Sequence, residues 1–425
     1  MRILIFSIIF CIVLVSFLAS PAPLFIEVSD VILIVLPCIL AVLSLTATTH
    51  YTLHKTEYSL FVAIMFYLSY LLLSILIALL HGVPFLNILR AIGPYLNFFP
   101  LLFICLLPNY LLTIGSISFV LIFVGSVQAI YQIYVYAIHS HEVVNTLGVL
   151  INRITLVEPR TTLPIVLSIT VLPLALLTSK NRTLIKHSLL QFVAVCLILL
   201  GIVAGAVTLT RSIILSILFG WLTFIVLYLY QQTLLNRSYF FKVFKKMLLC
   251  FILLIGCIIV LSSFEKIQLI EQGLLSRFYQ SEIVGDPDYS NGRIYDEWIP
   301  ALNRWLNSGI LGLFFGIGAG SSFTIASGEE RTYIHNLCIY NLVYGGLYGL
   351  LAYLFLYYTI FKTLLYRAWQ TNQTLYIAAA ALFSSIFFYG QLFAVHKGLA
   401  FNVMLFLMMV IALHQPKIKT NQQYS

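Results

Sequence analysis

The chain has 425 residues, of which 61% are hydrophobic and only 9% are charged, and its mean hydropathy is +1.02. This composition leaves too few polar residues to cover a water-soluble globule, so lipid must be the solvent for most of the surface. The formal net charge of +9 is explained by basic residues that flank the apolar segments, and it does not indicate a nucleic-acid partner.

Apolar runs of about 20 residues recur along the chain. A helix needs this length to cross a hydrocarbon core of about 30 Å. The runs are continuously apolar and do not alternate, which excludes the strands of a membrane barrel. We therefore predict an all-α polytopic membrane protein with about 12 transmembrane helices. The predicted spans lie near 3–19, 31–47, 58–80, 87–107, 111–137, 162–178, 187–208, 212–230, 247–263, 337–361, 374–391 and 398–414.

The first run follows Arg2 and ends in Ala19-Ser20-Pro21-Ala22, a pattern that a cleavable signal peptide also shows. We interpret it as a retained first span. Lysine and arginine concentrate in alternate loops, which predicts that both termini are cytoplasmic. We predict one membrane domain over residues 1–425, in which residues 264–336 form a large periplasmic or extracellular loop bearing part of the active site.

All fourteen acidic residues lie outside the predicted spans. An ion-coupled transporter usually keeps carboxylates at membrane depth to relay charge, so the distribution argues against a transporter. It also provides no acid pair that would hold a metal ion in the membrane or at the cytoplasmic side. The seven cysteines lie in or beside the spans, and the sequence therefore indicates neither a disulfide framework nor a metal site.

Two arginines lie where spans meet the outer surface. Arg90 precedes Gly93-Pro94, and Arg211 lies in a very short turn between two spans. Either side chain could extend to lipid headgroups without a further role. Alternatively, a guanidinium at this depth could bind the oxygens of a lipid-linked phosphate.

The outer segment contains a predicted amphipathic helix over residues 293–306. Its apolar stripe comprises Ile294, Trp298, Leu302 and Trp305, which is typical of a helix lying on a membrane surface. A neighbouring stripe comprises Arg293, Glu297 and Arg304, and it could also be a solvated face with an Arg293–Glu297 ion pair. Pro300 is expected to kink or restart this helix.

A glycine-rich stretch follows, with glycines at 312, 316, 318 and 320. Glycines let backbone approach backbone or ligand closely, and the amides of such a loop can bind an anion. The segment then closes with Arg331, His335 and Asn336, directly before a predicted span. A histidine at this boundary can be a simple interfacial residue, or it can take a proton from a hydroxyl nucleophile.

In combination these features resemble the O-antigen ligase and O-antigen polymerase superfamily of bacterial envelope glycosyltransferases. The resemblance covers residues 185–365 best, and the amino-terminal half only by topology and the Arg90 segment. The matching residues are Thr210-Arg211-Ser212, Gly292-Arg293, Gly316-Ile317-Gly318-Ala319-Gly320, His335-Asn336 and Gly346-Leu347-Tyr348-Gly349.

The resemblance implies a fold like that of the C-type glycosyltransferases, acting at the outer face of the bacterial inner membrane. Such proteins transfer a glycan from undecaprenyl diphosphate to an acceptor hydroxyl, in lipopolysaccharide or capsule polysaccharide biosynthesis. The acceptor is a lipid A core for a ligase and another lipid-linked repeat unit for a polymerase. No bound metal or cofactor is expected, and membrane lipids and a chain-length regulator are expected partners.

By the same pattern, Arg211 and Arg293 would grip the diphosphate, and His335 would orient or deprotonate the acceptor. The remaining predicted substrate-binding residues are Arg90, Arg304, Arg331, Asn336, Gly318 and Gly320. Many relatives have an acidic residue soon after the His-Asn pair, where this chain has Leu337-Cys338-Ile339-Tyr340. Glu329 or Glu330 could replace it. The alternative functions are a lipid-linked glycan flippase or other transporter, and a non-catalytic protein of envelope assembly.

Overall fold

The structure is a computed structural model of the chain. It describes residues 2–18, 55–95, 113–147, 166–178, 184–207, 211–235, 293–325, 328–392 and 399–413, with a few residues between 35 and 43. The predicted span at 247–263 and residues 264–292 of the outer segment lie outside this part, as does most of the predicted span at 31–47.

The described residues are almost entirely helical, and several helices match the predicted spans. Six helices are long and apolar enough to cross a membrane among the residues described: Tyr58–Leu80, Ile114–Tyr134, Ser188–Val207, Ser212–Gln232, Leu337–Thr371 and Thr374–Leu392. Shorter apolar helices cover Leu4–Val15, Val166–Thr178 and Phe401–Ala412. These elements fit an all-α polytopic membrane protein, as the composition predicts.

The contacts within the chain divide it into two compact units, and the predicted single membrane domain stays a prediction. The first unit contains Met1–Val120, Pro287–Thr371 and Ile386–Ser425, and the second contains Leu121–Asp286 and Asn372–Ser385. Helices α6 (Ile114–Leu147) and α16 (Thr374–Leu392) contribute residues to both units.

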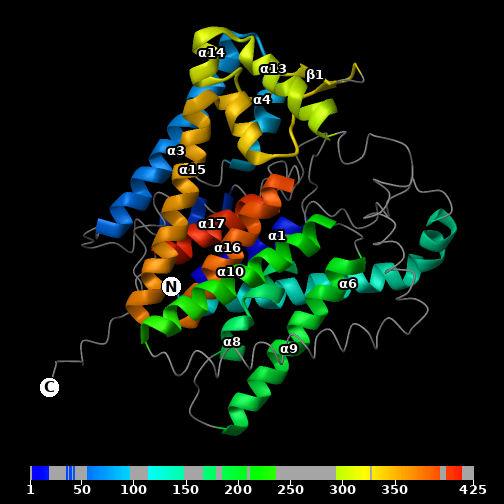
Figure 1. Ribbon diagram of the computed structural model, residues 1–425, viewed down its shortest axis with the longest axis vertical. Coiled ribbons are helices and arrows are strands. Elements are labelled where there is room, and N and C mark those ends of the chain that lie inside the picture. Colours follow the sequence, from blue (N-terminus) through cyan, green and yellow to red (C-terminus); the bar gives the residue numbers. More distant parts are fainter. Residues whose placement is uncertain are drawn as a thin grey trace. The chain divides into compact units, whose positions relative to one another are not determined.

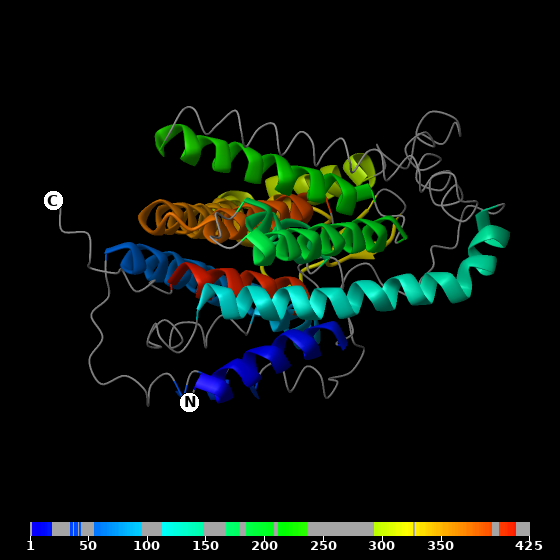
Figure 2. The same ribbon diagram turned by 90° about the horizontal axis from the view of Figure 1, so that it is seen from below.

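Among the described residues, the second unit contains α8 (Leu174–Thr178), α9 (Leu184–Val207) and α10 (Arg211–Leu235), which are drawn in green in Figures 1 and 2, besides parts of α6 and α16. Small residues allow close packing here, since a side chain on Gly201 would overlap Thr170. Polar side chains bond to backbone carbonyls, as between Trp221 Nε1 and Thr170 O at 3.0 Å. Such bonds satisfy polar groups where lipid offers no partner.

The first unit contains α1 (Arg2–Leu18), α3 (Lys55–Leu80), α4 (Phe85–Ile92), η1 (Gly93–Tyr95), α15 (Leu337–Thr371) and α17 (Leu399–Leu413). Helices α3 and α15 lie side by side (Figure 1). The rings of Phe66 and Tyr348 meet edge to face at 4.9 Å, and Ser69 Oγ and Tyr348 Oη share a hydrogen bond of 2.6 Å. Helix α17 packs against α15 and α1.

Helix α15 is broken at Gly346, whose φ of 64° and ψ of −163° are not helical. Two contacts show that residues 337–345 fold back along the longer second half. A side chain on Gly349 would overlap the carbonyl of Asn341, a residue two helical turns away in an unbroken α-helix. In addition, Gln391 bonds both the N–H of Cys338, at 3.2 Å, and the hydroxyl of Tyr353, at 3.1 Å.

This fold-back corrects the predicted span at 337–361. Thirty-five residues of unbroken helix would be roughly 50 Å long, far more than one crossing needs. Residues 347–371 alone have the length of a span, and residues 337–345 form a half-helix beside them. The sequence signal was Gly345-Gly346, because a glycine with positive φ permits the break.

The glycine-rich stretch is inserted between α3 and the break in α15. Ile317 N–H donates to Val343 O at 3.0 Å and Gly318 N–H donates to Tyr344 O at 3.2 Å. These two carbonyls precede the break, so their usual intrahelical donors are displaced and the loop amides replace them. Ala319 N–H donates to Ser74 O of α3 at 3.1 Å.

Gly346→Ala is expected to destabilise the protein strongly. Alanine would adopt an unfavourable positive φ, which costs about 1–3 kcal/mol, and its Cβ would overlap the backbone at Phe314. The measurement is the melting temperature in detergent. Gly93→Ala is the matched control, because Gly93 has a helical φ of −45° and open space around its Cβ. Equal melting temperatures for the two variants would contradict the backbone contact.

Short elements from residues 293–331 cover the half-helix: η2 (Arg293–Trp298), α13 (Ile299–Leu306), α14 (Gly309–Phe315), β1 (Phe323–Thr324) and β2 (Glu330–Arg331). The two strands pair antiparallel, with Phe323 opposite Arg331. As expected, Pro300 lies at the start of a new helix. Trp298, Leu302 and Trp305 of the predicted apolar stripe pack against a core that includes Tyr340 and Tyr344. Ile294 is exposed.

Candidate functional site

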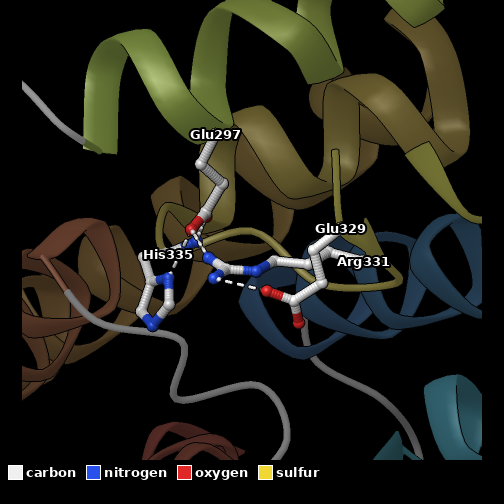
Figure 3. Close-up of polar contacts among 4 residues, drawn as sticks. All are labelled: Glu297, Glu329, Arg331 and His335. Atoms are coloured by element: carbon white, nitrogen blue, oxygen red, sulfur yellow. Dashed lines mark hydrogen bonds and ion pairs between the residues drawn. The ribbon is translucent and has the colours of Figure 1, made fainter. Parts of the chain in front are cut away.

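The centre of the site is a contact between Glu297 and His335. The carboxylate Oε2 lies 2.7 Å from His335 Nδ1, and Oε1 accepts the backbone N–H of His335 (Figure 3). Both carboxylate oxygens therefore hold one residue, by its ring and by its backbone. This contact orients the imidazole, and the other ring nitrogen, Nε2, points away from Glu297 (Figure 3).

Burial makes this contact strong. Glu297 is 2% exposed, whereas the side chain of His335 is 16% exposed. An ionised carboxylate that is removed from water needs charge-assisted partners, because an unpaired buried charge is very costly. The buried carboxylate of Glu297 therefore depends on its bonds to His335. The imidazole is mostly buried as well, but less completely than the carboxylate.

Arg331 is the second partner of Glu297. Its Nη1 lies 3.6 Å from Glu297 Oε2, and its Nη2 donates to Glu329 Oε2 at 3.2 Å. Its guanidinium also lies 5.7 Å from the ring centre of Tyr333, and that ring meets His335 edge to face at 5.3 Å. Arg331 therefore connects two acids and an aromatic ring around the histidine.

Local winding brings Glu297 inward. Residues 293–298 form a π-helical turn, which ends where α13 begins. Residues advance through a smaller angle in a π-helix than in an α-helix, so α-helical spacing misplaces Glu297. The interpretation of Glu297 as part of a solvated face is therefore wrong, because the side chain is buried against His335.

Asn336 fixes the chain on the other side of His335. Its Oδ1 accepts the N–H of Ile339 at 3.0 Å, and its Nδ2 donates to Gln391 O at 3.2 Å. The first bond is that of a helix N-cap, which satisfies a free amide at the start of α15. The predicted binding residue Asn336 thus has a structural role in positioning His335, and its role toward substrate stays a prediction.

The predicted glycines also have structural contacts. Gly318 and Gly320 are buried, and side chains there would overlap the backbone of α3 at Ala78 and of α4 at Asn87. The Gly318 N–H already donates to Tyr344 O. An anion could reach that amide only by breaking this bond, so close backbone packing is the role that the described contacts support.

The predicted arginines lie in different parts of the structure. Arg331 lies at the centre of the site, whereas Arg90 and Arg304 are exposed in the last turns of α4 and α13. Arg293 begins the π-helical turn that ends beside Glu297, and its side chain lies outside the described part. Arg211 begins α10 in the second unit. The structure does not relate that unit to the site.

The arrangement is suited to proton transfer. When Nδ1 donates to Glu297, Nε2 bears the lone pair of a neutral imidazole and can accept a proton from a hydroxyl group. The carboxylate then stabilises the imidazolium that forms, as the acid does in other base-and-carboxylate pairs. Among the described residues, no group of three or more His, Cys, Asp or Glu side chains is arranged so that it could hold a metal ion.

Sequence reasoning missed Glu297 as the partner of His335. It named Glu329 and Glu330 because they are close to His335 in the chain, but Glu329 contacts Arg331 and Glu330 is exposed in β2. Glu297 is 38 residues away from His335. The only available signal was the interrupted helix around Pro300, which made α-helical facing an unsafe guide there.

The fold and the site define an all-α membrane protein with a histidine held by a buried carboxylate beside a broken helix. Comparison with protein-family models gave no match, and comparison with curated proteins gave none either.

Proposed function

We propose that the chain transfers a glycan from undecaprenyl diphosphate to an acceptor hydroxyl at the outer face of the bacterial inner membrane. It would act as an O-antigen or capsular polysaccharide polymerase, or as an O-antigen ligase, with both termini in the cytoplasm. The observation that supports this most is the contact between Glu297 and His335, because a carboxylate that holds Nδ1 orients the imidazole and stabilises its protonated form. The sequence motifs around Arg211, Arg293 and His335 supply the glycosyltransferase part of the proposal.

The proposed reaction is a single displacement at the anomeric carbon of the donor. The acceptor oxygen forms the new glycosidic bond while its proton passes to Nε2 of His335. The bond between the anomeric carbon and the diphosphate oxygen breaks, and the diphosphate leaves with that electron pair. Charge develops on phosphate oxygens, so arginines fixed nearby would stabilise the transition state. Arg211 and Arg293 are the proposed arginines.

The proposed catalyst includes no metal ion, nucleotide or other cofactor. Its proposed partners are the lipid-linked donor, an acceptor that is either a lipid A core or a second lipid-linked repeat unit, membrane lipids and a chain-length regulator. A fold of about 12 spans like that of the C-type glycosyltransferases is part of the same proposal.

Deleting the gene and separating the envelope glycans on a gel tests this function. Loss of all glycan attached to lipid A core indicates a ligase, and attachment of single repeat units without a ladder indicates a polymerase. An unchanged profile would refute both.

Complementing the deletion with arginine variants tests the diphosphate site. Arg211→Ala and Arg293→Ala should each lower activity by about 10- to 100-fold, the loss of a charged hydrogen-bond donor. Arg293→Lys is the matched control for charge, and it should retain part of the activity because it lacks only the fork of donors. Full complementation by both alanine variants, at equal protein levels, would exclude the proposed binding of the diphosphate by these two arginines.

A further inference from the structure

Helix α14 exposes an apolar surface that the first unit itself does not cover. Ile310 and Leu311 are each 75% exposed, and Phe314 is 52% exposed. This differs from the stripe of α13, whose Trp298, Leu302 and Trp305 pack on protein. The sequence predicted that the 293–306 helix would meet the membrane with that stripe, but the structure leaves α14 with the uncovered apolar face.

The exposed face of α14 belongs to a larger apolar surface. Helix α14 packs against α15 and α3 (Figure 1), and the loop after it contacts the end of α3, where His81 Nδ1 lies 3.2 Å from Ile317 O. Leu79 and Leu80 of α3 are exposed there. At the start of α4, Phe85 is exposed as well. Exposed apolar side chains of three helices therefore occur around the same end of this unit.

We infer that α14 is seated in the hydrocarbon of the bilayer, together with the last turn of α3 and the first turn of α4. The occupant of the surface is lipid acyl chain, because the surface continues the exposed apolar side chains of the spans themselves, such as Leu76 of α3 and Leu351 of α15. An isolated patch on a water-exposed loop would favour a protein partner, but this patch adjoins spans that already face lipid.

The backbone contacts of residues 316–320 also support a location of α14 in the hydrocarbon. Residues 316–320 are buried, and three of their amides donate to carbonyls of α3 and α15. Irregular backbone can lie at membrane depth only when its polar groups are satisfied within the protein or face water. The glycine loop meets this condition at these amides, so α14 can enter the lipid without exposing them.

This location of α14 sets the depth of the Glu297–His335 pair. The half-helix begins at Leu337, two residues after His335, and ends at the break at Gly346, which lies against the backbone of Phe314 in α14. Nine residues of helix are roughly 13 Å long, and the half-helix folds back along the span. His335 therefore lies near the end of the half-helix that is farther from α14. This inference does not depend on the proposed function.

Depth-dependent quenching tests the location. A fluorescent amino acid is incorporated at Leu311 of the full chain, at Leu351 as the lipid-facing reference and at Glu330 as the water-facing reference. The proteins are reconstituted in phosphatidylcholine vesicles, in which part of the lipid has brominated acyl chains. Bromine should lower the fluorescence at Leu311 to the same extent as at Leu351 and leave that at Glu330 unchanged. Aqueous iodide should quench only the probe at Glu330.

Two outcomes would overturn the inference. Iodide quenching at Leu311 as strong as at Glu330 would place α14 in water. Protection from both quenchers would show that protein, such as a second copy of the chain, covers it. The elution profile of each labelled protein must match that of the unlabelled chain. Because no substrate is used, the result is independent of whether the glycosyltransferase proposal succeeds.

Discussion

His335→Ala is expected to lower the proposed rate of glycan transfer by about 10²- to 10⁴-fold, the usual contribution of a positioned general base. The acceptor hydroxyl is a poor nucleophile, and the imidazole is the group that receives its proton in the proposed reaction. The measurement uses purified protein with a defined lipid-linked donor and acceptor, at saturating concentrations of both. The effect should appear in kcat, because His335 is not proposed to bind the diphosphate.

His335→Gln separates proton transfer from shape. Glutamine fits a similar space and forms hydrogen bonds, but it does not take up a proton at neutral pH. The His335→Gln variant should therefore lose as much activity as the His335→Ala variant. Its melting temperature in detergent should stay closer to that of the unmodified protein. A glutamine variant with nearly full activity would show that His335 is not the base.

Glu297→Gln is expected to lower kcat by about 10- to 100-fold, the loss expected when a charged hydrogen-bond partner of the base becomes neutral. The substitution preserves the side-chain shape but removes the charge that stabilises the imidazolium. The KM for the donor should change little, because Glu297 acts through His335 as a positioning residue and is not itself proposed to bind the donor. A structural role alone would instead lower stability and leave kcat of the folded fraction unchanged.

The double variant tests whether the two residues act together. If Glu297 acts through His335, adding Glu297→Gln to His335→Ala should cause little further loss, since coupled residues are not additive. Glu329→Gln is the matched control, because Glu329 contacts Arg331 and is 62% exposed. It should have little effect, as exposed ion pairs contribute little. Multiplied losses in the double variant would mean that Glu297 acts independently of His335.

The candidate site could be predicted from the sequence only in part. His335 was accessible to prediction because a histidine between an outer segment and an apolar run is visible in one dimension. Glu297 was not, because its contact with His335 depends on a π-helical turn and on packing between distant segments. Because no acidic residue follows Asn336, the sequence suggested acids close to His335 in the chain. In the structure the acid that contacts His335 is Glu297, which is distant in the chain.

The glycines show the same limit of prediction from the sequence. Their density predicted close approach, which the structure confirms at Gly316 and Gly346, where each would overlap the other's segment if it had a side chain. The sequence could not tell whether the approaching group was a ligand or the chain itself. At Gly318 the described contact is with α3 and with a carbonyl that the break in α15 leaves without its helical donor.

The sequence by itself determined that this protein is helical and lies in a membrane, because long apolar runs can satisfy their backbone in lipid only as helices. It also located spans such as Tyr58–Leu80, where the apolar run and the helix coincide. Only the tertiary structure decided that residues 337–345 turn back, that Glu297 holds His335, and that α14 is the helix left apolar and uncovered. Each of these depends on contacts between segments far apart in the chain, and hydropathy along one segment does not encode them.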